Sequence, residues 1–513
     1  MRINKYVILM VVVPVFAVFF QVVSFDFLKY DDTINISENV LILNPSLAHV
    51  LKFWKAAFLN LYIPVTYTIW SGLGALSLAV FNGRLDPGMF HLFNLLIHAL
   101  NSLLVFFIIR KLLILKWKDL RWTPLAGAGI FGALIFGLHP VQVETVAWIT
   151  GLKGLLSGFF ALGALWLFLV YYPAEKKCLV YVLSTCFFAL ALLSMPSAVC
   201  LPVMLFLILL WVEPRITPRK IYPLLPWCAV ALSVILATRS AQPVGGLLGD
   251  YPWAIRPLVA LDAVMFYIFQ IIWPNVLSID YCRTPAYVVG LSWHNPYLWL
   301  WLPLLGIAWR LRYRPQWLVL GCAFLAGILP VSGLLPFGFQ LTSTVADRYL
   351  YFSMMVVTLA LSALVVKNPK PAIWALCFLL VTAAGVRSFY QCRHWKNTAA
   401  IMKHTLAYYP CSFRANLNYG IALTSRGDFR QAIPFYKTAQ RLRPDDPLPY
   451  YNLGVAYAGI NDKASYKRQY KKLSVMDKEK AVRLEAAAEA FEALYTSGKA
   501  GSRNGKESGS LKE

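Results

Sequence analysis

Long apolar runs, separated by short basic loops, constrain this chain more than any other feature of its sequence. The first run, VILMVVVPVFAVFFQVVS, ends at residue 24 and contains no charged residue. About 18 consecutive apolar residues are enough to cross the hydrocarbon core of a bilayer as a helix. Hydrophobic residues make up 59% of the chain, and charged residues only 14%. The sequence therefore predicts an all-α, polytopic membrane helical bundle.

We predict about eleven spans in this bundle, because that number of apolar runs reaches or approaches the required length. The first run lacks a small-residue cleavage site, so it is interpreted as a retained span rather than a signal peptide. The predicted spans are 7–24, 89–109, 124–138, 155–172, 178–195, 197–212, 221–238, 296–309, 317–335, 349–366 and 371–386.

The basic residues fix the predicted orientation. With the N-terminus inside, the inner loops (1–6, 110–123, 173–177, 213–220, 310–316 and 367–370) hold 17 Lys and Arg in 44 residues. The much longer outer stretches before residue 387 hold 9. Cytoplasmic loops of membrane proteins carry such an excess. Two further apolar stretches, 56–81 and 257–273, would reverse this pattern if they crossed, so both are interpreted as interfacial or re-entrant segments of the outer face.

After residue 386 the chain becomes polar and repeats itself every 34 residues. Pro410 and Pro444 are one pair at this spacing, and Gly420 and Gly454 are another. Small residues and prolines at these offsets are typical of tetratricopeptide repeats, in which two short helices pack closely. We predict a transmembrane domain at 1–386, a tetratricopeptide-repeat domain outside the cytoplasm at 387–495, and a disordered tail at 496–513.

Charge and cysteine content exclude several functions. The formal net charge is +24, but no nucleic-acid module appears, and the basic loops are explained by topology. The nine cysteines show no CxxC pair and no metal-ligand spacing. We therefore expect no metal site and no nucleic-acid partner. Cys392 and Cys411 are a candidate disulfide on the oxidising side.

Two adjacent carboxylates, Asp31 and Asp32, follow the first span directly in the sequence YDDTINISEN. Neighbouring carboxylates repel each other, and charges near a membrane are costly. One interpretation is a helix cap or a solvated turn. The other is a general base at the outer mouth of a membrane cavity. The local sequence leaves both open, as well as which aspartate is the base.

Polar residues on other predicted spans are candidates for the same cavity. His139 and Glu144 lie in HPVQVETVAW, at the outer end of the span 124–138. His91, Asn94, His98 and Asn101 share one face of the span 89–109, and such a face turns away from lipid. We expect His98 and Asn101 to bond between helices, and His91 and Asn94 to lie near the outer mouth.

The segment ADRYLYFS supplies a basic candidate. Arg348 is the only basic residue of the outer segment 336–348, and a guanidinium at the membrane surface suits a lipid phosphate. A salt bridge with Asp347 explains it equally well. Tyr349 beside it is a further candidate for the cavity.

Together these segments resemble the GT-C superfamily of membrane glycosyltransferases. More closely, the chain is similar to the transmembrane-and-tetratricopeptide-repeat O-mannosyltransferase family and its bacterial relatives. The resemblance follows most of the chain in order, and HPVQVETVAW and ADRYLY are its most specific motifs. The segments that carry it are YDDTINISEN, IPVTYTIW, HLFNLLIHALN, LHPVQVETVAWI, ADRYLY, and a repeat tail introduced by YQCRHWKN.

The resemblance implies an enzyme that takes a sugar from a polyprenyl-phosphate donor. In that superfamily the first external loop carries the acidic catalytic residue, which points to Asp31 or Asp32. Arg348 and Lys153 would hold the donor phosphate, and His91, Asn94, His139, Glu144 and Tyr349 would line the cavity. The acceptor would be a Ser or Thr hydroxyl of a protein, docked by the repeats. Transfer would be a single inverting displacement on the outer face of a bacterial inner membrane.

The chain departs from the family at three places. Thr33 stands where a third acidic residue is common, Ile63 where histidine is frequent, and Gly151-Leu152-Lys153-Gly154 where the family tends to carry Glu-Arg-Lys-Asp. These departures keep other functions open. The chain could be a non-catalytic scaffold acting through its repeats, a transporter of lipid-linked sugars, or an enzyme with a glycan or lipid acceptor.

Overall fold

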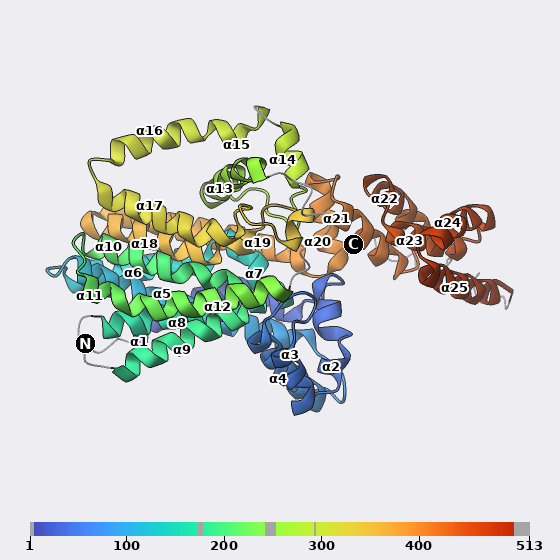
Figure 1. Cartoon of the computed structure of the whole chain (residues 1–513), viewed down its shortest axis with the longest axis horizontal. Coiled ribbons are helices and arrows are strands. Elements are labelled where there is room, and N and C mark those ends of the chain that lie inside the picture. Colours follow the sequence, from blue (N-terminus) through green and yellow to red (C-terminus); the bar gives the residue numbers. More distant parts are fainter. Residues whose placement is uncertain (1–4, 173–177, 242–252, 292–293, 497–513) are drawn as a thin grey trace. The chain divides into compact units, whose positions relative to one another are not determined.

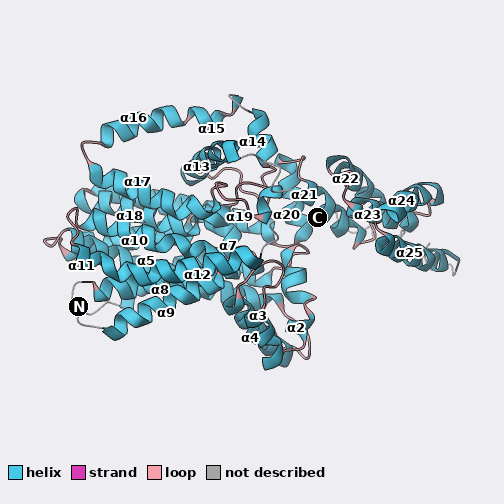
Figure 2. Cartoon of the chain, in the orientation of Figure 1, coloured by secondary structure: helices cyan, strands magenta, loops and turns pink. Residues whose placement is uncertain are grey.

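The chain is helical throughout its described part. The computed structural model describes residues 5–172, 178–241, 253–291 and 294–496. Regular structure in these ranges is helical (Figure 2), apart from one isolated β-bridge between Phe58 and Leu61. The chain divides into unit 1, residues 1–279 and 283–397, and unit 2, residues 280–282 and 398–513. The units are described separately below (Figure 1).

Unit 1 contains the long apolar helices of a membrane protein. Within the described residues, seven helical segments are long and apolar enough to cross a bilayer. The chain is therefore an integral membrane protein. The segments are Lys5–Ser24 (α1, Lys5–Phe19, and η1, Phe20–Ser24), α5 (Pro87–Lys116), Ile149–Tyr171 (η4, Ile149–Gly151, and α8, Leu152–Tyr171), Pro218–Thr238 (α11, Pro218–Ile221, η6, Tyr222–Leu224, and most of α12, Leu225–Ala241), Trp253–Ile272 (η7, Trp253–Ile255, and α13, Arg256–Ile272), Asp347–Lys367 (η11, Asp347–Leu350, and α18, Tyr351–Lys367) and Pro371–Trp395 (α19, Pro371–Cys392, and η12, Arg393–Trp395).

An eighth candidate span is bent at the HPVQVETVA segment. Helix α6 (Trp122–Leu138) ends at His139, and the chain continues through η3 (Pro140–Gln142) and α7 (Val143–Ala147) at an angle of 49°. Pro140 has no N–H to continue the hydrogen-bond ladder of α6, so the helix stops there. The bend brings an irregular backbone to the end of a span, as the sequence predicts for this motif.

The remaining predicted spans differ from simple long helices. Three are shorter apolar segments: α9 (Cys178–Ser194), Pro196–Val212 (η5, Pro196–Cys200, and α10, Leu201–Val212) and Pro315–Val331 (α17, Pro315–Ile328, and η9, Leu329–Val331). The predicted span 296–309 is wrong as a single helix. It is broken into α15 (Pro296–Trp299) and α16 (Trp301–Leu311), and the 11 residues of α16 reach only about 16 Å.

The two stretches interpreted as interfacial have different structures. In 257–273, α13 is a continuous helix that reaches spanning length together with η7. This stretch is therefore long enough to cross. In 56–81, helix α4 (Pro64–Val80) begins at a proline, which suits the first turn of a helix. Short elements precede α4 or join the later helices: η2 (Thr33–Ser37, a π-helix), α2 (Val40–Leu43), α3 (Leu47–Lys55), α14 (Pro285–Leu291) and η10 (Gly338–Leu341).

The polar stripe on α5 holds the centre of unit 1 together. His98 bonds the hydroxyl of Tyr351 at 3.0 Å and the carbonyl oxygen of Gly137 at 2.9 Å. Asn101 donates to the Tyr351 hydroxyl at 2.8 Å. Gly158 permits this contact, because a Cβ atom there would lie 2.5 Å from the Tyr351 ring. The prediction that His98 and Asn101 bond between helices is confirmed.

Unit 2 is a stack of helix pairs whose period is visible in the helix bounds. Helix α22 (Phe429–Leu442) and helix α24 (Lys463–Met476) begin and end 34 residues apart. Their first-helix partners are α21 (Phe413–Thr424) and α23 (Pro447–Gly459), with α20 (Thr398–Tyr408) before and α25 (Lys478–Thr496) after. The tail predicted to be disordered, 496–513, lies almost entirely outside the described residues.

The repeated glycines explain how the helices of unit 2 approach each other. A Cβ atom on Gly420 would lie 2.5 Å from the ring of Tyr436. One repeat later, a Cβ atom on Gly454 would lie 2.5 Å from the side chain of Leu484. Glycine at this repeat position therefore gives the facing helix room to pack.

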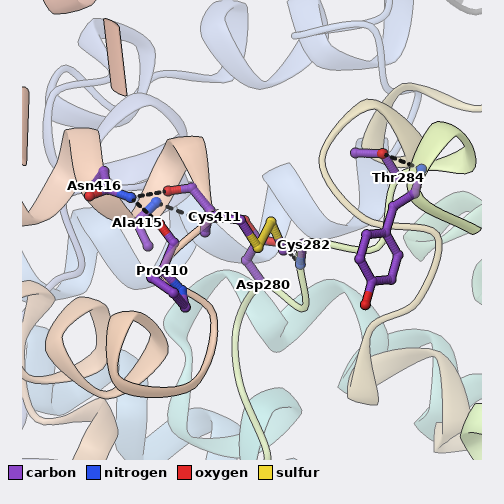
Figure 3. Close-up of a disulfide and its surroundings, with 9 residues drawn as sticks. Asp280, Cys282, Thr284, Pro410, Cys411, Ala415 and Asn416 are labelled. Carbon is purple, nitrogen blue, oxygen red and sulfur yellow. Dashed lines mark hydrogen bonds between the residues drawn. A yellow bond between two sulfur atoms is a disulfide. The ribbon is translucent and has the colours of Figure 1, made fainter. Parts of the chain in front are cut away.

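A disulfide closes unit 2 at its start. Cys282, in the short segment 280–282, is bonded to Cys411, with their Cα atoms 6.2 Å apart (Figure 3). The Ser412 hydroxyl donates a hydrogen bond to the buried carboxylate of Asp280 beside it. Burial raises the pKa of Asp280. The candidate pairing of Cys411 with Cys392 is wrong, because Cys392 is a buried free thiol in α19.

Candidate functional site

Asp32 is a structural clamp rather than an open carboxylate. Its side chain is fully buried. Oδ2 accepts a hydrogen bond from the Leu28 N–H at 2.9 Å, and Oδ1 accepts one from the Thr150 N–H at 3.0 Å and another from the Thr150 hydroxyl. Burial outweighs these bonds and raises the pKa of Asp32 to about 6. Asp32 thereby fixes the segment after η1 to the segment that follows α7.

Asp31, by contrast, presents a free carboxylate. Its side chain is half-buried, and among the described residues its carboxylate has no hydrogen-bond or ion-pair partner. Its charge acts on Lys153 and on Tyr349, so the carboxylate lies in the same cluster as those residues. The adjacent aspartates therefore differ: the Asp32 carboxylate is used in hydrogen bonds within the fold, and the Asp31 carboxylate is available to a ligand.

Two residues that sequence reasoning missed hold the backbone of Asp31. The amide of Asn35 donates to the Asp31 carbonyl oxygen at 2.7 Å, and the Tyr67 hydroxyl donates to the Asn35 side-chain oxygen at 2.6 Å. Asn35 lies in the π-helix η2, a distortion that is frequent at functional sites. Both residues belong to the segments that carry the family resemblance, YDDTINISEN and IPVTYTIW, which was the available signal.

Arg348 is paired, but with Glu144 rather than with Asp347. The Glu144 carboxylate accepts a hydrogen bond from the Arg348 backbone N–H at 2.9 Å and another from its guanidinium. The guanidinium also lies 4.3 Å from the ring centre of Phe339 and 5.5 Å from that of Trp148. The sequence analysis predicts that Glu144 lines the cavity and that Arg348 binds the donor phosphate. With this pairing only 10% of the Arg348 side chain stays exposed.

Lys153 is the free cation of the cluster. Among the described residues it forms no hydrogen bond and no ion pair, and its ammonium lies 5.7 Å from the ring centre of Trp148. The charges of Asp31, Asp32, Glu144 and Arg348 all act on it. Because Asp32 is clamped and Glu144 neutralises Arg348, the cluster offers a ligand one free anion, Asp31, and one free cation, Lys153.

A small hollow lies beside this cluster. Its free volume is about 10 Å³. Its walls include Arg348, Tyr349 and Gly154, and also Met195, Ser197, Gly327, Val331, Tyr351 and Phe352. A second small hollow, also with a free volume of about 10 Å³, shares Tyr351 and Phe352 with the first. Its other walls are apolar: Gly158, Ala161, Leu162, Leu165, Leu201, Met204 and Met355. One hollow therefore has a charged residue in its wall, and the neighbouring one is apolar apart from the Tyr351 hydroxyl.

Three of the predicted cavity residues are buried in the surrounding fold. Asn94 donates to the Trp148 carbonyl oxygen at 2.9 Å. His139 bonds the carbonyl oxygen of Ile271 at 3.0 Å. His91 packs edge-on against Phe25, with ring centres 6.1 Å apart. None of the three lines the cavity, whereas Tyr349 does. Their contact with a substrate stays a prediction.

Gly151, which stands where the resembled family tends to carry a glutamate, has a local reason. A Cβ atom on Gly151 would lie 2.3 Å from the Thr145 carbonyl oxygen, so a glutamate cannot fit this backbone. Polar atoms of the same region are buried without a hydrogen-bond partner in the described part of the chain. They are both amide atoms of Gln142, the Thr145 hydroxyl and the Trp148 indole N–H. Such atoms are costly, and in native proteins they call for an explanation.

Comparison with known families locates the repeats. Residues 420–460 match a family model described as a TPR repeat. Unit 2 is a tetratricopeptide-repeat region. The match covers the end of α21 and the whole of α22 and α23, and the helix bounds extend the same period on both sides. The predicted all-α fold with helical repeats after the membrane helices is confirmed.

Comparison with solved structures gives two matches to oligosaccharyltransferase from Archaeoglobus fulgidus. The crystal structure tethered by a disulfide bond to an acceptor peptide with the NVT sequon matches with a TM-score of 0.37 and 13% identity, over 76% of this chain. The crystal structure with Zn and sulfate matches with a TM-score of 0.30 and 12% identity, over 91% of this chain. The matched regions cover 55% and 56% of those chains. Comparison with curated proteins found no match.

Proposed function

We propose that unit 1 is a membrane glycosyltransferase of the GT-C type that moves a sugar from a polyprenyl-phosphate donor to an acceptor hydroxyl. The observation that carries the proposal is the difference between the two aspartates: the Asp32 carboxylate is bonded within the described part of the fold, and the Asp31 carboxylate is not. Asp32 is locked to Thr150 and Leu28, and this locking supports an available carboxylate at Asp31, beside a free ammonium. A solvated turn would need no such arrangement.

Asp31 acts as the general base in this scheme. It takes the proton of the acceptor hydroxyl as the hydroxyl oxygen bonds to the anomeric carbon. The bond from that carbon to the phosphate oxygen breaks, and its electron pair leaves with the polyprenyl phosphate. The other carboxylates of the described cluster, Asp32 and Glu144, are both engaged in hydrogen bonds, so we expect no covalent intermediate and an inverted product. A positioned base typically contributes about 10²–10⁴ in rate.

Lys153 and the exposed part of Arg348 receive the phosphate. Charge grows on the phosphate oxygens as the sugar leaves, and a cation that is already in place stabilises that charge without reorganising. The side chains beyond Tyr351 and Phe352 are apolar, Leu162 and Met355 among them, so the polyprenyl chain of the donor would lie along this apolar surface. The phosphate would meet the cations.

The acceptor and the membrane side are parts of the same proposal. We expect a Ser or Thr hydroxyl of a protein as acceptor, with the repeats of unit 2 as a docking module. The distribution of basic loops supports an external site, with the N-terminus in the cytoplasm of a bacterium.

The test is release of polyprenyl phosphate from a radiolabelled polyprenyl-phosphate sugar by the purified full-length protein. Asp31→Asn should lose about 10²–10⁴ of the rate and keep its melting temperature. Asp32→Asn should lower both the rate and the melting temperature. Loss of activity in Asp32→Asn alone would reverse the assignment of the base. No release by the wild type with any polyprenyl-phosphate sugar would favour the transporter or the scaffold.

A further inference from the structure

The second helices of the two repeats, α22 and α24, carry basic side chains and no acidic ones. Helix α22 is FRQAIPFYKTAQRL and helix α24 is KASYKRQYKKLSVM. The next helix, α25, has the sequence KEKAVRLEAAAEAFEALYT and mixes both signs. The one-sided charge is therefore a property of the repeat helices and not of unit 2 as a whole.

The basic side chains of the two helices lie on a shared face. Lys437 and Lys471 are 34 residues apart, so they occupy equivalent positions of adjacent repeats. The side chains of Gln440 and Gln469 join the two helices by a hydrogen bond of 3.0 Å. Within each helix the basic residues follow spacings of three, four and seven, which keep them on one side. We call this the basic face: Arg430, Lys437, Arg441, Lys467, Arg468, Lys471 and Lys472.

The basic face is exposed, and Asp462, at the start of α24, is an acidic residue whose charge acts on it, through Arg468. All seven side chains are exposed, and none forms an ion pair in the described part of the chain. Lys463 is not counted in the face, because it pairs with Glu492 of α25 at 2.6 Å. Seven like charges repel one another, so the face is most stable against an anionic partner.

Apolar side chains mark the C-terminal ends of the same helices. Val475 of α24 is 86% exposed, Met476 is 37% exposed, and Leu442 of α22 is 39% exposed. Val475 follows Lys471 and Lys472 on their side of α24, four and three residues later. Basic residues beside exposed apolar tips are typical of helices that lie in a membrane interface.

We propose that the basic face binds the anionic headgroups of phospholipids. Unit 2 is tethered to the bilayer by a short connection, because the last candidate span ends at Trp395 and α20 begins at Thr398. The bilayer is therefore an anionic surface that is always near this unit. Such tethering raises the effective concentration of the surface, so contacts that are weak one by one are sufficient. The proposal does not depend on the glycosyltransferase reaction.

The test is lysine acetylation of the native full-length protein in nanodiscs, read by mass spectrometry. Lys437, Lys467 and Lys471 should react roughly fivefold more slowly when the nanodiscs contain phosphatidylglycerol than in phosphatidylcholine alone. High salt should remove the difference, because it screens exposed charges. Lys478 of α25 is exposed and lies off the basic face, so it is the internal control and should change little.

A variant separates binding by the basic face from a general effect of the anionic bilayer. In Lys467→Glu/Lys471→Glu, protection of Lys437 should disappear, because α24 no longer holds the face on the bilayer. Equal reactivity of Lys437 in both kinds of nanodisc would overturn the proposal. So would protection by added polyglutamate but not by phosphatidylglycerol, which would assign the face to an acidic protein instead.

Discussion

The Asp32 carboxylate accepts hydrogen bonds from both the N–H and the hydroxyl of Thr150, a residue 118 positions later in the chain. This contact joins the segment after η1 to the segment after the bent α6–α7 pair. It also determines which of the two neighbouring aspartates remains available. The following predictions start from this contact and from the residues around it.

Thr150→Val removes the hydroxyl donor to Asp32 and preserves the shape of the side chain. A buried carboxylate that loses one of its donors should cost about 1–3 kcal/mol of stability, seen as a lower melting temperature of the purified protein. Thr145→Val is the matched control, because the Thr145 hydroxyl is buried without a partner. That control should be neutral or stabilising. Equal losses of melting temperature in both variants would contradict a stabilising role for the Asp32–Thr150 contact.

Asp32 should also give the protein a measurable pH dependence. Its pKa in the folded state is about 6, above the reference value of 3.8. Between these values the folded state binds the proton more tightly than the unfolded state does. The contribution of Asp32 to stability is therefore present at low pH and is lost as pH rises from about 4 to about 6, by about 3 kcal/mol in total.

Comparison with Asp32→Asn isolates this effect, because all other groups titrate alike in both proteins. Wild type should exceed the variant in melting temperature most strongly near pH 4, and this advantage should shrink toward pH 7. An advantage that stays constant or grows with pH would show that Asp32 is not buried in this way.

Tyr67 is expected to position the base without touching the substrate. Tyr67→Phe removes the bond to Asn35, which holds the Asp31 carbonyl oxygen, so the carboxylate should lose its fixed orientation. We expect kcat to fall about tenfold, with KM for the donor nearly unchanged. The control is Tyr62→Phe, whose hydroxyl bonds the Trp54 carbonyl oxygen on the exposed side of the same segment. A change in KM alone would indicate contact with the donor instead.

The sequence predicted the helical class and the repeats well, because both depend on local periodicity. Apolar runs indicate membrane helices, and Gly420 and Gly454 mark a fixed spacing. Failures arose where tertiary contacts decide. The predicted span 296–309 is broken into two short helices. The pairing of Cys411 with Cys282 joins residues 129 positions apart, which spacing alone cannot show.

Within the candidate site, residue types were easier to predict than their roles. Asp31 and Asp32 have the same side chain, and only burial and the contact with Thr150 distinguish them. Arg348 was a plausible partner for Asp347 next to it, yet its partner is Glu144, 204 positions away. Asn35 was within a quoted motif and Thr150 directly follows one, but neither carried a signal of its own, because their importance lies in what they contact.

The Glu144–Arg348 pair gives a last prediction that separates fold from function. Glu144→Gln leaves a buried guanidinium without its counter-charge and should cost about 3–5 kcal/mol of stability. Replacing both partners, as Glu144→Gln/Arg348→Met, removes the uncompensated charge and should recover most of the melting temperature. If Arg348 also holds the donor phosphate, this recovered protein should still show a raised KM for the polyprenyl-phosphate sugar. A double variant with wild-type KM would leave Lys153 as the cation that binds the phosphate, and would restrict Arg348 to holding the fold.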